Sequence, residues 1–552
     1  MTRDGIADLV VFAGTVVTMD SDPATSDGAE GVAIVAGEVV AIGNRTALQA
    51  RIDETTRVVD LPGAVILPGF VDSHIHPVFG IELTRGADLS RCRTLADVES
   101  ALRAEVAGLS PEDWLLGWGL DPNVFGEEAV SHAVLNSVAG ERPARIRFFD
   151  AHAALASDAA LALGGVTGRE EFTDGSRVVT DEQGRPTGYL LELQAIDLVE
   201  RVLPPLSFEH RVDALYEVLL NMARGGFTSG QVQDLAPDAI PLLTAIEETR
   251  DLPIRLRMSP WYVPGTPIEE VVRLAALQGA HGRHWVVEGV KLMIDGTIDN
   301  GTAWLHEPDC LGESTTSLWL DPDQYRNALT ELDRRGIPTT THAIGDAGID
   351  FVVRAIDGLT EHAATHRIEH IETMTDAALA VFMSSKATAS MQPTHCTLFT
   401  RADESDNWSR RLGHARAGRG FRTRDLVSAG IPLALGSDWP VAPSDAVGIL
   451  ADAQLRRPHD DPTAPPIGPD QALDAMDALR GLTVEPYRTI GRTGGVLRAG
   501  AVADITVLDR DPRTVDPESL GEAAVLLTIV DGRVVVDAGV SGVRGSSRGG
   551  RR

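Results

Sequence analysis

The sequence predicts an α/β protein, a (β/α)8 TIM-like barrel with a small β-sandwich built from both chain ends and an insertion after barrel strand 1. Three observations predict this fold. Short apolar runs alternate with helical patterns through the middle of the chain, β-branched hairpin patterns occur at both ends, and one connection is too long for a single crossover.

The middle of the chain supplies the barrel, because eight apolar runs are separated by amphipathic helical patterns that suit its outer ring. The candidate strands are Val65–His74, Thr228–Gln233, Ile254–Pro260, Gly289–Ile294, Thr339–His342, His366–His370, Ala387–Gln392 and Pro432–Gly436. The candidate helices are Phe208–Arg224, Asp238–Arg250, Ile268–Gln278, Pro322–Arg335, Gly348–Glu361 and Asp376–Ser384.

The two chain ends supply the sandwich. Strand patterns at Ala7–Phe12 and Glu38–Ile42 have counterparts at Ala503–Leu508 and Arg533–Val536, and neither end is large enough for a core of its own. We therefore assign residues 1–67 and 485–540 to the sandwich, 68–484 to the barrel, and the Gly/Ser/Arg-rich residues 541–552 to a disordered tail.

Residues 85–205 form the insertion. A segment inserted directly after the first barrel strand leaves and re-enters at the mouth of the barrel. We therefore expect a packed subdomain that lies over the mouth as a wall or lid and supplies substrate contacts.

Composition excludes several classes of protein. The formal charge of −31 repels phosphate backbones and anionic membranes, so no nucleic-acid or membrane partner is expected. The first residues lack a signal-peptide pattern and no apolar run is long enough to span a membrane, which predicts a cytoplasmic protein. Three scattered cysteines are too few for a disulfide framework or a thiolate metal site.

Two histidines stand where the first barrel strand ends. His74 and His76 are two residues apart on a strand, so both imidazoles point to the same side and can reach one metal ion. The pattern is weak alone, but His342, His370 and Asp438 also end predicted strands. Strand ends converge at one mouth of a barrel, where these side chains are expected to meet.

Lys291 lies in an apolar strand. The chain has one other lysine, Lys386, and all its other basic side chains with a permanent charge are arginines. A lysine here indicates a role that a guanidinium cannot fill. One such role is carbamylation by carbon dioxide, which gives a carboxylate able to bridge two cations. The alternative is a buried lysine paired with Asp295 or Glu288.

These motifs resemble the amidohydrolase superfamily of metal-dependent hydrolases, in particular the amidohydrolase 3 or YtcJ-like group that includes N-substituted formamide deformylases. The segments that carry the resemblance are Pro68–His76, Val290–Thr297, His342–Asp346, His366–His370 and Gly436–Asp438. The likeness runs over about residues 7–537.

The resemblance implies a role for each motif residue. His74, His76 and Asp438 resemble the ligands of a buried metal ion, His342 and His370 those of a more exposed one, and Lys291 the carbamylated bridge. It implies two divalent ions, for which zinc suits the nitrogen and oxygen donors, with a bridging hydroxide as nucleophile. Asp438 is the implied catalytic residue, moving a proton from the hydroxide to the leaving nitrogen.

Weaker matches give candidate substrate-binding residues. His152, Trp118 and Asp121 lie in insertion segments that resemble family segments. Asp295 belongs to the fourth-strand motif, and His395 follows the seventh predicted strand, as a substrate contact or a partner of a ligand.

The sequence thus predicts an enzyme, a metal-dependent hydrolase that cleaves an amide-type C–N bond in a small-molecule substrate such as an N-substituted formamide or N-acyl compound. The alternatives are a mononuclear deaminase of the same superfamily, which needs no bridging lysine, and an inactive scaffold, which would lack ligands. Oligomeric state is not readable, although a homodimer is the common default.

Overall fold

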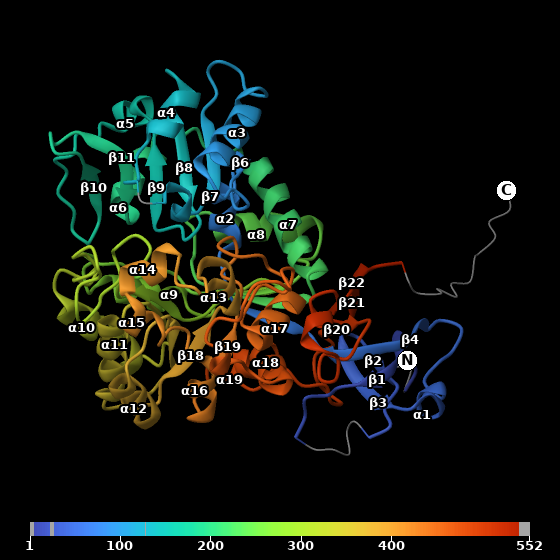
Figure 1. Cartoon of the computed structure of the whole chain (residues 1–552). Helices are drawn as coiled ribbons and strands as arrows, with labels where there is room; N and C mark the ends of the chain where they lie inside the picture. Colours follow the sequence, from blue (N-terminus) through green and yellow to red (C-terminus); the bar gives the residue numbers. More distant parts are fainter. Residues whose placement is uncertain (1–4, 22–26, 127, 540–552) are drawn as a thin grey trace.

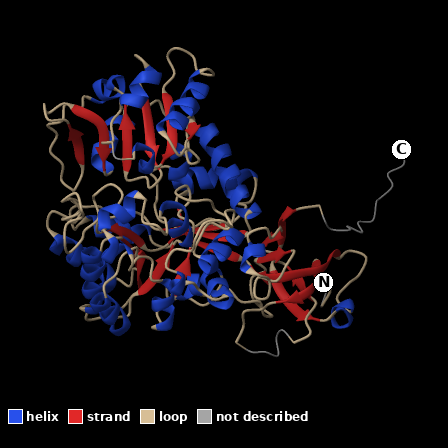
Figure 2. Ribbon diagram, viewed as in Figure 1, coloured by secondary structure: helices blue, strands red, loops and turns tan. Residues whose placement is uncertain are grey.

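The computed structural model describes residues 5–21, 27–126 and 128–539. It is an α/β protein with four sheets (Figures 1 and 2). The tail predicted at 541–552 lies outside the described residues. No helix in the described part is long and apolar enough to cross a membrane.

Strands from both ends of the chain pair in one seven-stranded sheet, ordered β22-β21-β20-β4-β1-β2-β3. Its strands are β1 (Leu9–Val16), β2 (Gly31–Val35), β3 (Glu38–Gly43), β4 (Arg57–Pro68), β20 (Ile505–Leu508), β21 (Val525–Val530) and β22 (Arg533–Asp537). The sheet curls back on itself, so that β3 lies beside the residues that precede β20. The Val39 N–H donates to the Ala501 carbonyl there at 2.8 Å. Short helices α1 (Arg45–Gln49) and α20 (Pro517–Leu520) accompany it.

The middle of the chain forms two sheets of parallel strands. One contains β5 (Phe70–Ile75), β12 (Phe227–Val232), β13 (Arg255–Met258) and β14 (Trp285–Val287). The other contains β15 (Val290–Met293), β16 (Thr339–Ala343), β17 (His366–His370), β18 (Thr388–Met391) and β19 (Leu433–Leu435). Isolated parallel bridges link the sheets at two seams, Ile75 with Trp439 and Trp261 with Lys291.

Helices cover these sheets on the outside (Figure 2). They are α7 (Phe208–Arg224), α8 (Ala239–Thr249), α9 (Glu270–Leu277), α10 (Pro322–Arg334), α11 (Asp346–Asp357), α12 (Asp376–Ser384), α16 (Thr423–Ser428), α17 (Ala446–Leu455), α18 (Ala475–Leu482) and α19 (Glu485–Arg488). The largest buried cluster lies between the second sheet and these helices, with Tyr325 and Trp319 among its fully buried side chains.

The first predicted barrel strand, Val65–His74, is two strands in the structure. Residues up to Pro68 belong to β4 in the terminal sheet, and β5 starts at Phe70. The break falls at Gly69, where a Cβ would lie 2.1 Å from Thr228 Oγ1, so no larger residue fits this close approach. The division places β5 among the parallel strands that carry the histidines.

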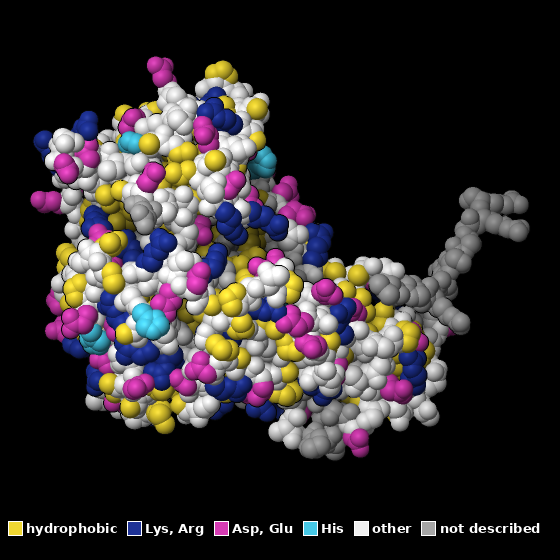
Figure 3. Space-filling view, viewed as in Figure 1, with side chains coloured by type: hydrophobic (Ala, Val, Ile, Leu, Met, Phe, Trp, Pro, Cys, Tyr) yellow, Lys and Arg dark blue, Asp and Glu magenta, His cyan; other side chains and the backbone are white. Residues whose placement is uncertain are grey.

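The insertion folds around a six-stranded sheet, ordered β10-β11-β9-β8-β7-β6, that stands above the parallel strands (Figure 1). Helix α2 (Pro77–Leu83) precedes it. Its elements are β6 (Ala87–Asp88), α3 (Leu95–Val106), β7 (Leu115–Leu120), α4 (Ala133–Ala139), β8 (Ala144–Phe148), β9 (Ala153–Ala156), α5 (Asp158–Gly164), β10 (Arg177–Thr180), β11 (Pro186–Leu191) and α6 (Leu193–Glu200). It has its own buried cluster, which includes Leu115, Ile146 and Leu155. Figure 3 shows basic side chains gathered where it meets the rest of the molecule.

Candidate metal centre

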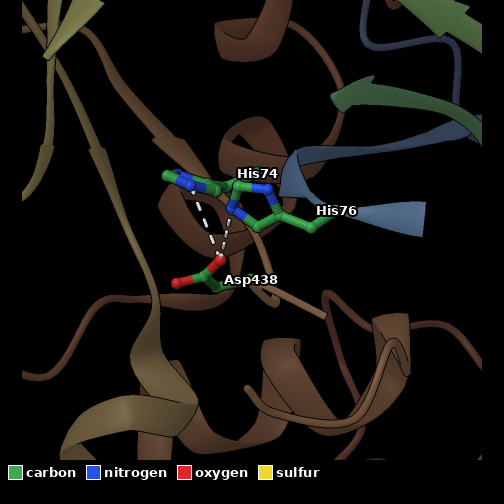
Figure 4. A group of neighbouring side chains, drawn as sticks. All are labelled: His74, His76 and Asp438. Carbon is green, nitrogen blue, oxygen red and sulfur yellow. Dashed lines mark ion pairs between the residues drawn. The ribbon is translucent and has the colours of Figure 1, made fainter. Parts of the chain in front are cut away.

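Two histidines and an aspartate meet where β5 and β19 end (Figure 4). His74 Nε2 and His76 Nε2 lie 3.5 and 3.3 Å from Asp438 Oδ1. The backbone holds them together, because the Asp438 N–H donates to the His74 carbonyl at 2.8 Å. Nitrogen and carboxylate donors converging on one point are the ligand types of a zinc site.

Asp72, fully buried below His74, fixes the seam between the two strands. Its carboxylate accepts hydrogen bonds from the Ser437 N–H at 2.9 Å and the Ser437 hydroxyl at 2.6 Å. Asp438 then takes a left-handed backbone conformation with φ +60°, which is costly for a residue with a side chain. The surrounding contacts hold the carboxylate toward the histidines against this strain.

Three histidines are oriented by partners on their Nδ1 atoms. His74 Nδ1 lies 2.9 Å from Glu369, His76 Nδ1 lies 2.7 Å from Asp234, and His370 Nδ1 lies 2.9 Å from the Gln392 side-chain oxygen. Because these oxygens only accept, each Nδ1 carries the hydrogen, and the Nε2 lone pair is left for a metal ion. This arrangement is typical of metal-bound histidines.

His370 belongs to a second candidate group. It joins His395 and Asp438, whose ligand atoms lie within 4.8 Å of one another. Asp438 Oδ1 and His395 Nε2 are buried atoms without a hydrogen-bond partner among the described residues. Leaving such atoms unpaired is costly, so the donors fit a bound cation that would satisfy them.

His342 stands beside this group with a different orientation. Its ring centre is 4.5 Å from that of His370, and its Nε2 lies 3.1 Å from the Gly296 carbonyl. The carbonyl accepts, so Nε2 carries the hydrogen and Nδ1 is the nitrogen left for a metal.

Lys291 lies among the histidines, 3% exposed, with Nζ 3.3 Å from His74 Nε2. Burial lowers its pKa to about 8, despite the nearby negative charges of Glu369 and Asp438. The ion pairs proposed as its alternative role are not formed. Asp295 accepts backbone hydrogen bonds, and Glu288 pairs with Arg257 and Arg492.

The charges of the site divide into two sets. Burial first, and positive neighbours second, hold the pKa values of His74, His342 and His370 well below the ordinary value, so these rings are neutral. Burial also disfavours charge on His76, but Asp234 and Asp438 raise its pKa to about 9. The pKa of Asp438 is lowered because the nearby histidines outweigh burial. Neutral imidazoles and an ionised carboxylate are the metal-binding forms, so His76 must release a proton when a cation binds.

The insertion reaches the site with the loop 149–152 and with Leu193 at the start of α6. His152 lies at 4.9 Å from His342 between ring centres, and its Nδ1 is 2.8 Å from the buried Glu192. Burial opposes its protonation, but Glu192 and Asp150 raise the pKa of His152 to about 9. Phe149 from the same loop stacks on Phe399 at 3.8 Å.

These residues line one cavity above the metal centre. Its walls are mainly apolar and aromatic, with lining side chains Phe79, Leu83, Phe149, Leu193, Trp261, Phe399, Trp408 and Phe421. Its polar lining includes Asp150, Thr297 and Glu372 beside the candidate ligands. An apolar pocket with a few converging polar groups is typical of a small-molecule site.

Three predicted substrate contacts lie elsewhere. Trp118 is half-buried on β7 and does not line the cavity. Asp121 accepts hydrogen bonds from the Asn123 backbone and side chain at the start of a short 3-10 turn. Asp295 is fully buried and accepts N–H groups of Trp304, Ile344 and Gly345, which anchors loops beneath the cavity.

Sequence reasoning did not single out the residues that orient the histidines. Glu369 lies within the His366–His370 motif, and Gln392 ends the predicted strand Ala387–Gln392. Asp234 directly follows the predicted strand Thr228–Gln233, at a position similar to those of the candidate ligands. That position at a strand end was the signal that could have found Asp234. Glu192 also directly follows a strand, β11 (Pro186–Leu191), but that strand belongs to the insertion and was not among the predicted barrel strands.

Comparison with known proteins agrees with this geometry. Residues 57–536 match the Amidohydrolase family, and the chain belongs to that family. YtcJ of Bacillus subtilis (strain 168), a protein named as an amidohydrolase, is 27% identical to this chain. The match covers 93% of this chain and 96% of YtcJ. The N-substituted formamide deformylase of Arthrobacter pascens is 23% identical, over 95% of this chain and 97% of the deformylase. A crystal structure of an uncharacterized metal-dependent hydrolase from Pyrococcus horikoshii superimposes with a TM-score of 0.66 at 23% identity, over 92% and 99% of the chains.

Proposed function

We propose that this protein is a metal-dependent hydrolase that cleaves an amide-type C–N bond in a small molecule, an N-substituted formamide or N-acyl compound. One observation carries the proposal: His74, His76, His370 and His395 surround Asp438, whose Oδ1 atom is buried without a hydrogen-bond partner in the described part of the chain. The family match and the deformylase relative support the choice of bond.

The bound ions would supply a water of lowered pKa and polarise the substrate carbonyl. One ion would be held by His74, His76 and Asp438. The other ion would be faced by His342, His370 and His395, with the carbamate of Lys291 between the two ions. A pKa of about 8 favours this modification, because the neutral amine is the form that reacts with carbon dioxide.

Asp438 is the proposed proton carrier. Its lowered pKa keeps the carboxylate ionised, and its position between the two groups of histidines would let it take up a proton and pass that proton to a leaving nitrogen. His152 would contact the substrate from the insertion, while Phe149 and Trp261 exclude water around the bond to be cleaved.

We also propose that the two parallel sheets close into one (β/α)8 barrel and that the terminal sheet is the expected β-sandwich. The bridges of Ile75 with Trp439 and of Trp261 with Lys291 support the first, and the return of β3 to residues 500–503 supports the second.

The test combines elemental analysis with a substrate panel of formamides, N-acyl amino acids, carbamates and lactones. We expect about two divalent ions per chain, loss of activity on chelation, restoration by zinc or another first-row ion, and turnover of amides above lactones. One tightly bound ion with full deaminase activity would favour the mononuclear alternative. Full metal content without turnover of any amide would refute the proposed reaction.

A further inference from the structure

A second pocket lies behind one wall of the catalytic cavity. It is formed by the α14–α16 region, with α14 (Asn407–Leu412) and α15 (His414–Ala417), and by residues 466–471. Thr400, Trp408 and Phe421 line both spaces, so the wall between them is one layer of side chains. Trp408 stacks on Phe421 and donates to Glu372 at 2.7 Å, which keeps this wall in place.

Arg456, at the base of the pocket, is an unusual buried arginine. It is 3% exposed, and it has no carboxylate partner among the described residues. The other buried arginines each have one: Arg145 and Arg147 pair with Glu200, Arg367 with Glu369, and Arg457 with Glu518. Because a buried charge is costly unless it is paired, Arg456 lacks an expected anion.

The hydrogen bonds of Arg456 leave donors for a ligand. Its Nε donates to the Ile467 carbonyl at 2.8 Å and its Nη1 to the Phe421 carbonyl at 3.2 Å. Its Nη2 has no partner in the part of the chain that the structure describes. The guanidinium has five N–H donors and keeps its charge at any accessible pH, so two neutral carbonyls satisfy only part of it.

Two further arginines line the same pocket. Arg401 and Arg419 are exposed, and neither has a carboxylate partner within the described ranges. The acidic side chains of the lining are mostly engaged elsewhere: Asp376 and Asp425 pair with Arg422, and Glu404 with His414, which leaves Asp470. Figure 3 shows basic side chains gathered on this face, over the region of α15 in Figure 1.

We infer that this pocket binds a small anion, a carboxylate or phosphate group, between Arg401, Arg419 and Arg456. These three guanidiniums line one hollow without a carboxylate partner in the described part of the chain, and guanidinium groups are suited to binding planar or tetrahedral oxyanions. Arg401 Nη1 also donates to the Leu398 and Thr400 carbonyls, which leaves its other N–H groups for a ligand. The anion is either the remote end of the substrate or a separate effector, which would act on the shared wall through Arg456 and Phe421.

Isothermal titration of the metal-loaded full chain with inorganic phosphate tests the site without any turnover. The double variant Arg401→Gln/Arg419→Gln removes two rim donors, and Arg410→Gln on α14 is the matched control, because Arg410 is exposed, unpaired and outside the pocket lining. We expect a binding component that the double variant weakens at least about tenfold and the control leaves unchanged. Phosphate bound at the metal ions gives a component common to all three proteins.

Identical isotherms for wild type and the double variant would overturn the inference, and so would an equal loss in Arg410→Gln, which would show a long-range charge effect. Arg456→Met, checked for folding by circular dichroism, should also lose the component if Arg456 contacts the anion. Retention of full affinity by a folded Arg456→Met protein would overturn that contact.

A kinetic comparison separates the two sources of the anion, and this arm rests on the proposed function. Two substrates differing only in a terminal carboxylate or carboxamide are compared. If the anion is part of the substrate, the double variant raises KM for the carboxylate substrate alone, and phosphate competes with it. If it is an effector, phosphate changes kcat or KM of both substrates alike. Phosphate binding without turnover of either substrate would sink the proposed function and leave the anion site standing.

Discussion

Replacing Lys291 with methionine distinguishes a metal bridge from an ordinary ion pair by the sign of a stability change. The side chain is buried and has no carboxylate partner among the described residues, and its pKa is about 8 instead of the ordinary 10.5. That difference means that the folded, metal-free protein disfavours the ammonium by about 3 kcal/mol at neutral pH. Methionine has a similar length and no charge. The metal-free Lys291→Met protein should therefore be more stable than wild type.

The pH dependence follows from the direction of the shift. Below pH 8 the amine is charged in both states, so wild type carries the whole penalty, and between pH 8 and 10.5 only the unfolded state holds the proton. The advantage of Lys291→Met should therefore be largest at pH 7 and shrink toward pH 10. Thermal or denaturant unfolding of chelator-treated proteins at both pH values measures this.

Metal content gives the second half of the same test. Lys291→Met should lose at least one of two ions, because methionine cannot form a carbamate, and a short carboxylic acid added with metal should restore part of the activity. A variant that is less stable than wild type when metal-free, and that still holds two ions, would refute the bridge. A crystal of metal-loaded wild type with an unmodified amine far from any ion would refute it as well.

Four other substitutions test the remaining roles. His152→Ala should lower kcat or raise KM with metal content unchanged. Trp118→Ala should leave both constants near wild type, since Trp118 does not line the cavity. Wild-type kinetics in both variants would argue against a role of the insertion in catalysis. Asp234→Asn should weaken metal affinity about 10–100-fold, as read by competition with a chelator, because it removes the charge behind His76. Asp438→Asn should reduce kcat by at least about 10²-fold, and a smaller loss would assign the proton transfer elsewhere.

The ligand residues were predictable because each ends a strand. His74 and Asp438 follow apolar runs, His370 ends the strand His366–His370, and the geometry of parallel strands brings such positions together whatever the loops do. The helices Phe208–Arg224 and Asp376–Ser384 were likewise readable in full, since the amphipathic period and the caps at Ser207 and Thr375 agree.

Contacts made between distant loops were not predictable. His395 was expected as a substrate contact or a partner of a ligand, but it lies in α13 (Pro393–Phe399), whose first turn brings it beside Asp438. The orientation of Trp118 depends on the insertion sheet, in which β10 takes the edge position outside β11 and β9 pairs with β11 instead of β10. No local pattern encodes such an order, because it is set by which surfaces bury each other in three dimensions.

Backbone strain marks the positions where chemistry overrides local preference. His370 and Asp438 have φ values of +72° and +60°, and Glu192 and Ala151, which flank the His152 loop, have +64° and +61°. Glycine would adopt these conformations at no steric cost, yet it could not supply the imidazole of His370 or the carboxylates of Asp438 and Glu192. Each such residue costs about 1–3 kcal/mol, and three of them, Ala151, His370 and Asp438, line one cavity. A barrel that served only as a scaffold would gain stability by relaxing them, so their retention favours an active site over the inactive alternative.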